Sequence, residues 1–268
     1  MRVIIESDYQ ALSQWAAKYV ASKINAANPT PEKPFVLGCP TGSSPLGMYK
    51  ALIELNKQGK VSFQNVVTFN MDEYVGLPED HPESYHTFMW KNFFNHIDIK
   101  KENVHILNGN AEDLEAECAN YEKQIAEIGG IDLFMGGIGP DGHIAFNEPG
   151  SRLNSTTRLI LLDNASRNEA SKIFGTIENT PISSITMGVS TILGAKKVYL
   201  LAWGENKAAM IKECVEGPIS DTIPASYLQT HNNAHVAIDL SASMNLTRIQ
   251  RPWLVTSCEW NDKLIRSA

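Results

Sequence analysis

The chain has 268 residues, a formal net charge of −7 and 43% hydrophobic residues, which is enough for one domain, residues 1–268, with a sizeable core. The acidic balance and the lack of a basic run exclude a general nucleic-acid-binding role. The sequence shows neither an apolar run of about 18 residues nor the apolar segment of a secretion signal, so we expect a cytoplasmic protein without a membrane partner.

Apolar runs alternate with segments of helical periodicity along the chain. A strand at 3–5 precedes a helix that begins after Ser7, because Ser7 and Gln10 have the spacing of a capping box. The other expected elements are strands at 35–38, 66–71, 104–107 and 131–135 with helices at about 45–58, 84–95 and 114–128, then an apolar run at 159–162, a helix at 167–174, strands at 185–188 and 198–203, a helix that begins near 207 and a strand at 235–238.

This alternation predicts an α/β fold, with a doubly wound, mostly parallel sheet and helices on both faces, in the manner of a modified Rossmann fold. The tail with Trp253 and Trp260 carries no pattern that assigns it to an element. The cysteines lack the spacing of a zinc site or of a disulfide framework, so we expect buried thiols at Cys39, Cys118, Cys214 and Cys258.

The residues after the strand at 35–38 suit an anion. Thr41, Gly42, Ser43 and Ser44 lead into a helix and supply hydroxyls and unpaired amides, which fit phosphate oxygens. The spacing of a Walker loop is absent. An ordinary helix capped by a serine explains the same residues equally well.

Two further strands end in ionisable residues. Asp72 follows the strand at 66–71, and the strand at 131–135 runs into a glycine-rich loop with Asp141, His143 and Glu148. In open α/β sheets, ligands bind outside the carboxyl ends of the strands. A loop Asp or His taken singly is often only a turn former or a solvated side chain, but two carboxylates around one imidazole are typical of a general base that works near neutral pH.

Four segments carry a resemblance to a known family: PTGSSP at 40–45, FNMDEYVGL at 69–77, GGIGPDGHIAFNEPG at 136–150 and LAWGENKA at 201–208. Together they closely resemble the glucosamine-6-phosphate deaminase family, over nearly the whole chain. The Asp-Gly-His loop alone also occurs in 6-phosphogluconolactonases, whereas the FNEP and NMDEY segments are specific.

The resemblance implies conversion of glucosamine 6-phosphate to fructose 6-phosphate and ammonia in amino-sugar catabolism, without a metal or cofactor. It assigns Asp72 to enolisation and the loop residues Asp141, His143 and Glu148 to ring opening. It also implies a mobile lid at about 160–182 and a homo-oligomer, a hexamer. The substrate and its phosphate are expected to contact Thr41, Gly42, Ser43, Ser44, Gly137, Ala145, Lys207 and Lys172, the last of which stands where the family usually has an Arg.

The chemistry of the residues agrees with these roles. A His near neutral pH suits the proton shuttle of ring opening, and a carboxylate in a partly desolvated cleft suits removal of a proton next to a carbonyl. Two alternatives stay open. A phosphosugar lactonase needs the two loops but not a base at C2, and a non-catalytic phosphosugar sensor usually brings a DNA-binding module, which this sequence does not indicate.

The sequence departs from the family at the site where activated members bind N-acetylglucosamine 6-phosphate. Ser151 and Arg158 match the pattern, but Arg152 replaces a small polar residue and Ile160 stands where a second basic residue, a Lys, is usual. We therefore expect weak or absent activation by this effector.

Overall fold

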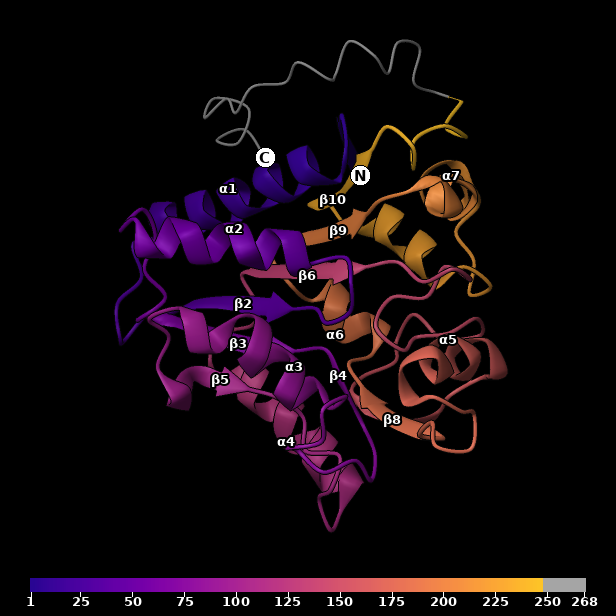
Figure 1. The fold of residues 1–268 in the computed structure, drawn as a ribbon, viewed down its shortest axis with the longest axis horizontal. Coiled ribbons are helices and arrows are strands. Elements are labelled where there is room, and N and C mark those ends of the chain that lie inside the picture. Colours follow the sequence, from indigo (N-terminus) through magenta and orange to yellow (C-terminus); the bar gives the residue numbers. More distant parts are fainter. Residues whose placement is uncertain (248–268) are drawn as a thin grey trace.

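The computed structural model describes residues 1–247, so Trp253, Cys258 and Trp260 lie outside the described residues. Seven strands form a parallel sheet with the order β1-β10-β9-β6-β2-β3-β5. Figure 1 shows the strands from β10 to β5 stacked one below another. In this order, the strands are Arg2–Glu6, Ala234–Asp239, Val198–Ala202, Leu133–Gly137, Phe35–Cys39, Val66–Asn70 and Val104–His105.

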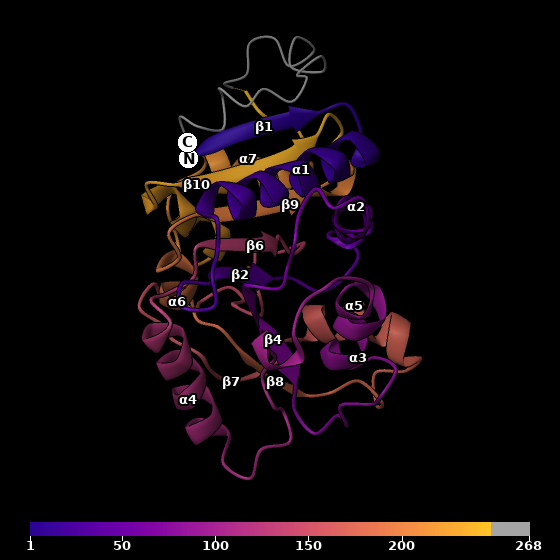
Figure 2. The same cartoon turned by 90° about the vertical axis from the view of Figure 1, so that its left-hand side faces the viewer.

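Helices cover both faces of this sheet, which confirms the predicted fold. Side chains of α1, α2 and α3 form one buried cluster with Leu133 and Met135 of β6, and side chains of α4, α6 and α7 form another with Phe134. Figure 2 shows α2 on one side of the sheet and α4 and α6 on the other. The α-helices α1 to α7 are Tyr9–Ala27, Leu46–Lys57, Tyr85–Asn92, Leu114–Glu127, Asn164–Phe174, Val189–Leu193 and Ala208–Glu216, and short 3-10 helices are Phe94–His96, Lys101–Asn103, Glu205–Lys207 and Pro224–Thr230.

A second sheet of three antiparallel strands is not anticipated by the sequence analysis. Its order is β4-β8-β7, and the strands are Asp72–Tyr74, Ser183–Thr186 and Arg158–Leu161. β4 follows β3 after a single residue, Met71, whose carbonyl accepts a hydrogen bond from the Met187 N–H at 2.7 Å. Asp72 therefore begins a strand of the second sheet, and the strand expected at 66–71 ends at Asn70.

The capping box expected at the first helix is wrong. Helix α1 begins at Tyr9, and Asp8 is its N-cap, because the Asp8 carboxylate accepts a hydrogen bond from the Ala11 N–H at 2.9 Å. Ser7 instead donates its hydroxyl hydrogen to Asp8. The spacing of Ser7 and Gln10 predicts Ser7 as the N-cap. The charged acceptor Asp8, one residue later, is the N-cap instead.

The described cysteines, Cys39, Cys118 and Cys214, are free and buried, as expected. Within residues 1–247, no helix is both long enough and apolar enough to cross a membrane.

Candidate active site

Strands β2 and β6 are neighbours near the middle of the large sheet, and the chain winds away from them in opposite directions. From β2 it continues to β3 and β5, and from β6 to β9 and β10. Such a switch point opens a crevice at the carboxyl ends of the strands, where α/β proteins bind ligands. The two expected ligand loops meet here, because a Cβ built on Gly137 would lie 3.8 Å from Oγ of Ser44.

The loop after β6 places the His143 side chain in contact with the Asp141 carboxylate. Gly139 donates its N–H to the His143 carbonyl at 2.9 Å, and a Cβ on Gly139 would overlap the His143 imidazole. Gly142 has a φ of +86°, so this tight loop needs glycine at both positions. Nδ1 of His143 lies 2.6 Å from Oδ1 of Asp141, and the two side chains are each 21% exposed. This is an ion-pair distance without hydrogen-bond alignment, since Nδ1 has no hydrogen-bond partner among the described residues.

The charge of Asp141 is well suited to orient this imidazole. Burial raises the pKa of Asp141, but its contacts with His143 outweigh burial, so the pKa lies below its usual range. An ionised carboxylate beside Nδ1 favours the tautomer with the proton on Nδ1. Nε2 is then the nitrogen that can take a proton from a ligand.

Glu148 joins this loop to the start of α5. Both of its carboxylate oxygens accept a hydrogen bond from the Asp163 N–H at 3.2 Å, and Asp163 is the N-cap of α5. Burial raises the pKa of Glu148, and the charge of His143 acts in the opposite direction. The structure thus brings the three expected ring-opening residues into one electrostatic group.

Asp72 reaches the same region from the second sheet. It pairs with Thr186 of β8, and Oγ1 of Thr186 accepts a hydrogen bond at 3.1 Å from the N–H of Phe146, which lies between His143 and Glu148 in the sequence. The Asp72 side chain is buried, and its Oδ1 has no partner among the described residues. Burial and the charge of Glu73 raise the pKa of Asp72 well above its usual range.

The loop at 41–44, which is expected to bind phosphate, lies at the start of α2. That helix has no side-chain cap, so the alternative of a serine-capped helix is wrong. Gly42, with a φ of +81°, and Ser43 are exposed, and Thr41 and Ser44 are half-buried. Hydroxyls and backbone amides that precede a helix N-terminus suit an anion.

The remaining expected substrate residues fall into two places. Nζ of Lys207 donates a hydrogen bond to the Ile138 carbonyl at 2.9 Å, which brings its charge to the loop after β6. Ala145 lies in that loop with a φ of +51°, a left-handed conformation that is uncommon for alanine. Lys172 is exposed in the last turn of α5, within the segment expected to form a lid.

The four residues at the positions of the expected effector site, Ser151, Arg152, Arg158 and Ile160, line a hollow of about 450 Å³. Nη1 of Arg158 donates to Oδ1 of Asn147 at 2.9 Å, and Nη2 donates to Oγ of Ser151 at 3.3 Å. The whole lining consists of Phe146, Glu148, Pro149, Gly150, Ser151, Arg152, Asn154, Ser155, Arg158 and Ile160. Glu148 therefore borders this hollow and also belongs to the group around His143 that is expected to open the ring.

Sequence reasoning missed three residues that hold the site together: Tyr9, Glu73 and Thr186. Oη of Tyr9 accepts a hydrogen bond from the Gly47 N–H at 2.8 Å and so holds the first turn of α2. Glu73 contacts the start of α3, and Thr186 contacts the segment after His143. Tyr9 and Thr186 contact residues 38 and 40 positions away, and Glu73 contacts residues 12 and 13 positions away, so no local pattern marks these contacts.

Among the described residues, no group of three or more His, Cys, Asp and Glu side chains is placed to hold a metal ion. The fold and the site together define a doubly wound α/β protein with a cluster of Asp, His and Glu side chains and a loop rich in hydroxyls and amides at its switch point. Within that class, the chain belongs to the family described as "Glucosamine-6-phosphate isomerases/6-phosphogluconolactonase", whose model matches residues 7–237.

Curated relatives and a solved structure are similar over most of the chain. A glucosamine-6-phosphate deaminase of Phocaeicola vulgatus is 73% identical over 92% of this chain and 94% of its own length. A glucosamine-6-phosphate deaminase-like protein of Bacteroides thetaiotaomicron is 65% identical over 98% of this chain, which spans 41% of that protein. The solved structure of a monomeric glucosamine-6-phosphate deaminase has a TM-score of 0.87 at 42% identity, and the match covers 91% of this chain and all of that chain.

Proposed function

We propose that this protein is an isomerising deaminase, which converts glucosamine 6-phosphate and water to fructose 6-phosphate and ammonia in amino-sugar catabolism. The observation that carries the proposal is the meeting of two acid–base groups from different sheets. Thr186 pairs with Asp72 and also accepts a hydrogen bond from the segment between His143 and Glu148. The 73% identity to a relative of that name supports the same substrate.

Ring opening is the task of the group around His143. Nε2 takes the proton of the C1 hydroxyl, and the proton returns to the ring oxygen as the C1–O bond opens to the aldehyde. Asp141, whose Oδ1 lies 2.6 Å from Nδ1, orients the imidazole through its charge. General acid–base catalysis of this kind typically contributes about 10²–10⁴-fold.

Enolisation is the task of Asp72. The open-chain aldehyde acidifies the C2 proton, and the Asp72 carboxylate takes it to give an enolamine. Return of a proton to C1 gives the imine of the ketose, which water hydrolyses to fructose 6-phosphate and ammonia. Burial of Asp72 supports this role, because a desolvated carboxylate is a stronger base than one in water.

Phosphate binding falls to the loop at 41–44 together with Lys207. The start of α2, where the N-cap residue Pro45 makes no side-chain hydrogen bond, and the position of Lys207 on the loop after β6 support this assignment. Segment 160–182 acts as a lid that brings Lys172 to the phosphate. The bond between Glu148 and the start of α5 supports a coupling of this segment to the site.

The proposed assembly is a homo-oligomer. Edge strand β7 and the nearby chain expose large apolar side chains, of which Leu161 is 75% and Ile182 is 61% exposed, and such side chains favour self-association. The solved deaminase described as monomeric makes a monomer the competing outcome. Light scattering in solution separates the two, because a hexamer has six times the 29.6 kDa mass of one chain.

Ammonia release on mixing with glucosamine 6-phosphate tests the reaction. We expect stoichiometric ammonia and fructose 6-phosphate, and no hydrolysis of 6-phosphogluconolactone above the rate in buffer. Lactone hydrolysis without ammonia would favour the lactonase branch of the family. Binding of the amino-sugar phosphate without any turnover would favour a sensor.

A further inference from the structure

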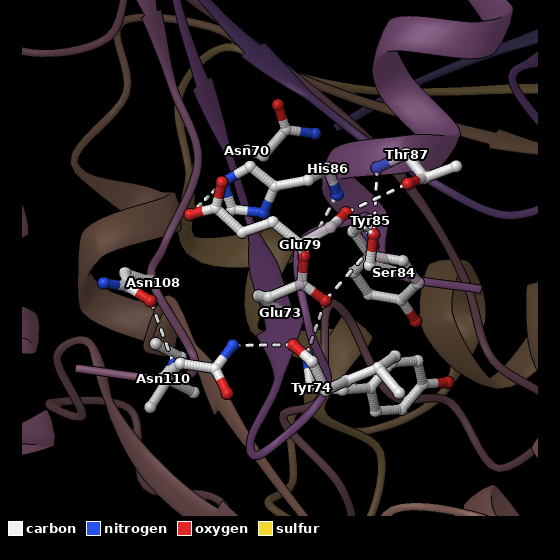
Figure 3. Close-up of polar contacts among 12 residues, drawn as sticks. Asn70, Glu73, Tyr74, Glu79, Ser84, Tyr85, His86, Thr87, Asn108 and Asn110 are labelled. Atoms are coloured by element: carbon white, nitrogen blue, oxygen red, sulfur yellow. Dashed lines mark hydrogen bonds and ion pairs between the residues drawn. The ribbon is translucent and has the colours of Figure 1, made fainter. Parts of the chain in front are cut away.

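The Glu73 side chain is unusual for a carboxylate, because it is only 2% exposed and has polar contacts at both oxygens. Oε1 accepts hydrogen bonds from the backbone N–H groups of Tyr74 and Tyr85 at 2.8 and 3.1 Å. Oε2 accepts from the His86 N–H at 3.0 Å and lies 2.9 Å from the His86 Nδ1. Figure 3 shows Glu73 among the residues that begin α3.

These contacts tie strand β4 to the N-terminus of α3. Tyr85 and His86 are the first two residues of α3, and Ser84, its N-cap, accepts the N–H of Thr87 at 3.0 Å. Glu73 therefore satisfies two helix amides that the cap leaves open, and its charge favours the positive end of the helix. Nε2 of His86 lies 3.7 Å from Oε1 of Glu79, so the imidazole stands between a buried and an exposed carboxylate.

The neighbouring Asp72 lacks such an anchor of its own. Its Oδ1 is buried without a hydrogen-bond partner among the described residues, so the backbone of β4 must set the position of the carboxylate. On one side β4 pairs with β8, and Asp72 stands opposite Thr186. Because successive residues of a strand point to opposite sides, Glu73 can hold β4 from the side away from the Asp72 carboxylate.

We propose that Glu73, held by His86, is a positioning residue that fixes the Asp72 carboxylate for proton abstraction at C2. This inference rests on the proposed function, because it needs Asp72 to be the enolisation base. Glu73 itself touches no substrate. Its role is to keep a buried, unpaired carboxylate at the required distance without a hydrogen bond that would weaken it as a base.

The charge of Glu73 also acts on Asp72, since it raises the pKa of that carboxyl in addition to burial. Among the described residues, Tyr74 on the same strand, Tyr85 on α3 and Tyr121 on α4 also lie near Asp72, because its charge raises the pKa of each. Burial raises the pKa of each of these phenols. They therefore stay neutral across the pH range in which a carboxylate base titrates.

The test is Glu73→Gln, with the exchange of the C2 proton of glucosamine 6-phosphate into deuterated solvent as the main measurement. Glutamine keeps the shape of the side chain. Its NH₂ group, however, must face backbone N–H groups that donate hydrogen bonds to the carboxylate in the parent protein. We expect exchange and kcat to fall by roughly 10- to 100-fold with KM changed by less than about 3-fold, as for displacement of a reacting group. The acid limb of the pH profile of exchange should move to lower pH, because the substitution removes the charge of Glu73 that raises the pKa of Asp72.

Glu122→Gln is the matched control. Oε1 of Glu122 accepts the N–H and hydroxyl of Thr157 at 2.7 and 2.6 Å and the hydroxyl of Thr191, so this carboxylate also joins distant segments. Glu122→Gln should lower the free energy of unfolding. The exchange rate of the folded variant and the pH profile of this rate should equal those of the parent protein.

His86 variants extend the test to the case in which Glu73→Gln does not fold. His86→Ala should slow exchange, and His86→Asn should restore part of the rate, because its amide can donate to Glu73 as Nδ1 does. The inference is overturned if folded Glu73→Gln exchanges at the parent rate with an unmoved acid limb, or if the two His86 variants are equally active. A parent protein that releases no ammonia from glucosamine 6-phosphate instead contradicts the proposed function itself.

Discussion

Asp72 is the residue on which the proposed chemistry depends most. Replacement by asparagine keeps the shape of the side chain and removes the base. We expect Asp72→Asn to bind the sugar phosphate with nearly the parent affinity and to lose C2 exchange and turnover together, by about 10²-fold or more. Exchange at the parent rate would show that another group abstracts the proton. Calorimetric titration with a non-reacting analogue such as a 2-deoxy sugar phosphate checks binding.

The same substitution has a consequence for stability. The folded pKa of Asp72 lies well above its usual value, so the unfolded chain ionises this group at lower pH than the folded protein does. Stability from this group is complete below the unfolded pKa, near 3.9, and is lost as pH rises through the folded pKa. Asp72→Asn removes that loss. Thermal unfolding should show a higher Tm for the variant at pH 8 and a smaller difference near pH 4, and a difference that shrinks with rising pH would contradict this account.

His143 separates ring opening from the later steps. A glutamine at this position cannot carry a proton between the C1 hydroxyl and the ring oxygen, but it leaves Asp72 in place. We expect His143→Gln to lose far more activity on the cyclic substrate than on an open-chain analogue, which needs no shuttle. Equal losses on both substrates would remove the ring-opening role from His143.

At the scale of elements, the large sheet could be predicted from the sequence and the small one could not. Strands such as 131–135 are apolar on both faces, which is a strong local signal for a buried parallel strand. Strand β4 has three residues, Asp72–Tyr74, two of which are acidic, and the strand that pairs with it, β8, lies more than 100 residues further along the chain. Long-range pairing rather than local pattern makes it a strand.

The site divides in the same way. The group around His143 is contiguous in sequence, so its composition alone indicates its chemistry. The hydrogen bonds from the first amides of α3 to the buried Glu73 carboxylate depend on the three-dimensional fold. The sequence shows only that Glu73 is an acidic residue that follows Asp72. Likewise, Asp8 displaces Ser7 as the cap of α1 because both can cap, and only geometry decides.

The short 3-10 helix Glu205–Lys207 allows a test of the proposed phosphate site. It follows β9 and delivers Lys207 to the Ile138 carbonyl. One lost charge-assisted hydrogen bond costs about 1.5–3 kcal/mol, so Lys207→Ala should raise KM by roughly 10- to 100-fold with a smaller change in kcat. Lys123→Ala is the control, because Lys123 forms an exposed pair with Glu127 on α4. An unchanged KM in Lys207→Ala would remove this lysine from the phosphate site.

Regulation depends on contacts between distant parts of the molecule. The hollow next to Glu148 is lined both by the segment after β6 and by strand β7 of the small sheet. A ligand in this hollow can change the position of Glu148 only if it binds there with sufficient affinity. Arg158 already donates to Asn147 and Ser151, and Ile160 offers no charge. The loss of one of two phosphate-directed cations should weaken an anionic effector substantially.

We therefore expect substrate saturation curves of the parent protein to change little when N-acetylglucosamine 6-phosphate is added. Ile160→Lys returns a cation to the lining of the hollow and should make the curves respond to the effector, whereas Ile160→Met, which keeps the size without the charge, should not. Because Arg152 adds a charge from a different backbone position, Arg152→Ser in the parent measures how far it compensates. A strong shift from a sigmoidal to a hyperbolic curve in the parent would show that one well-placed guanidinium, with Arg152, is enough to couple this hollow to the site.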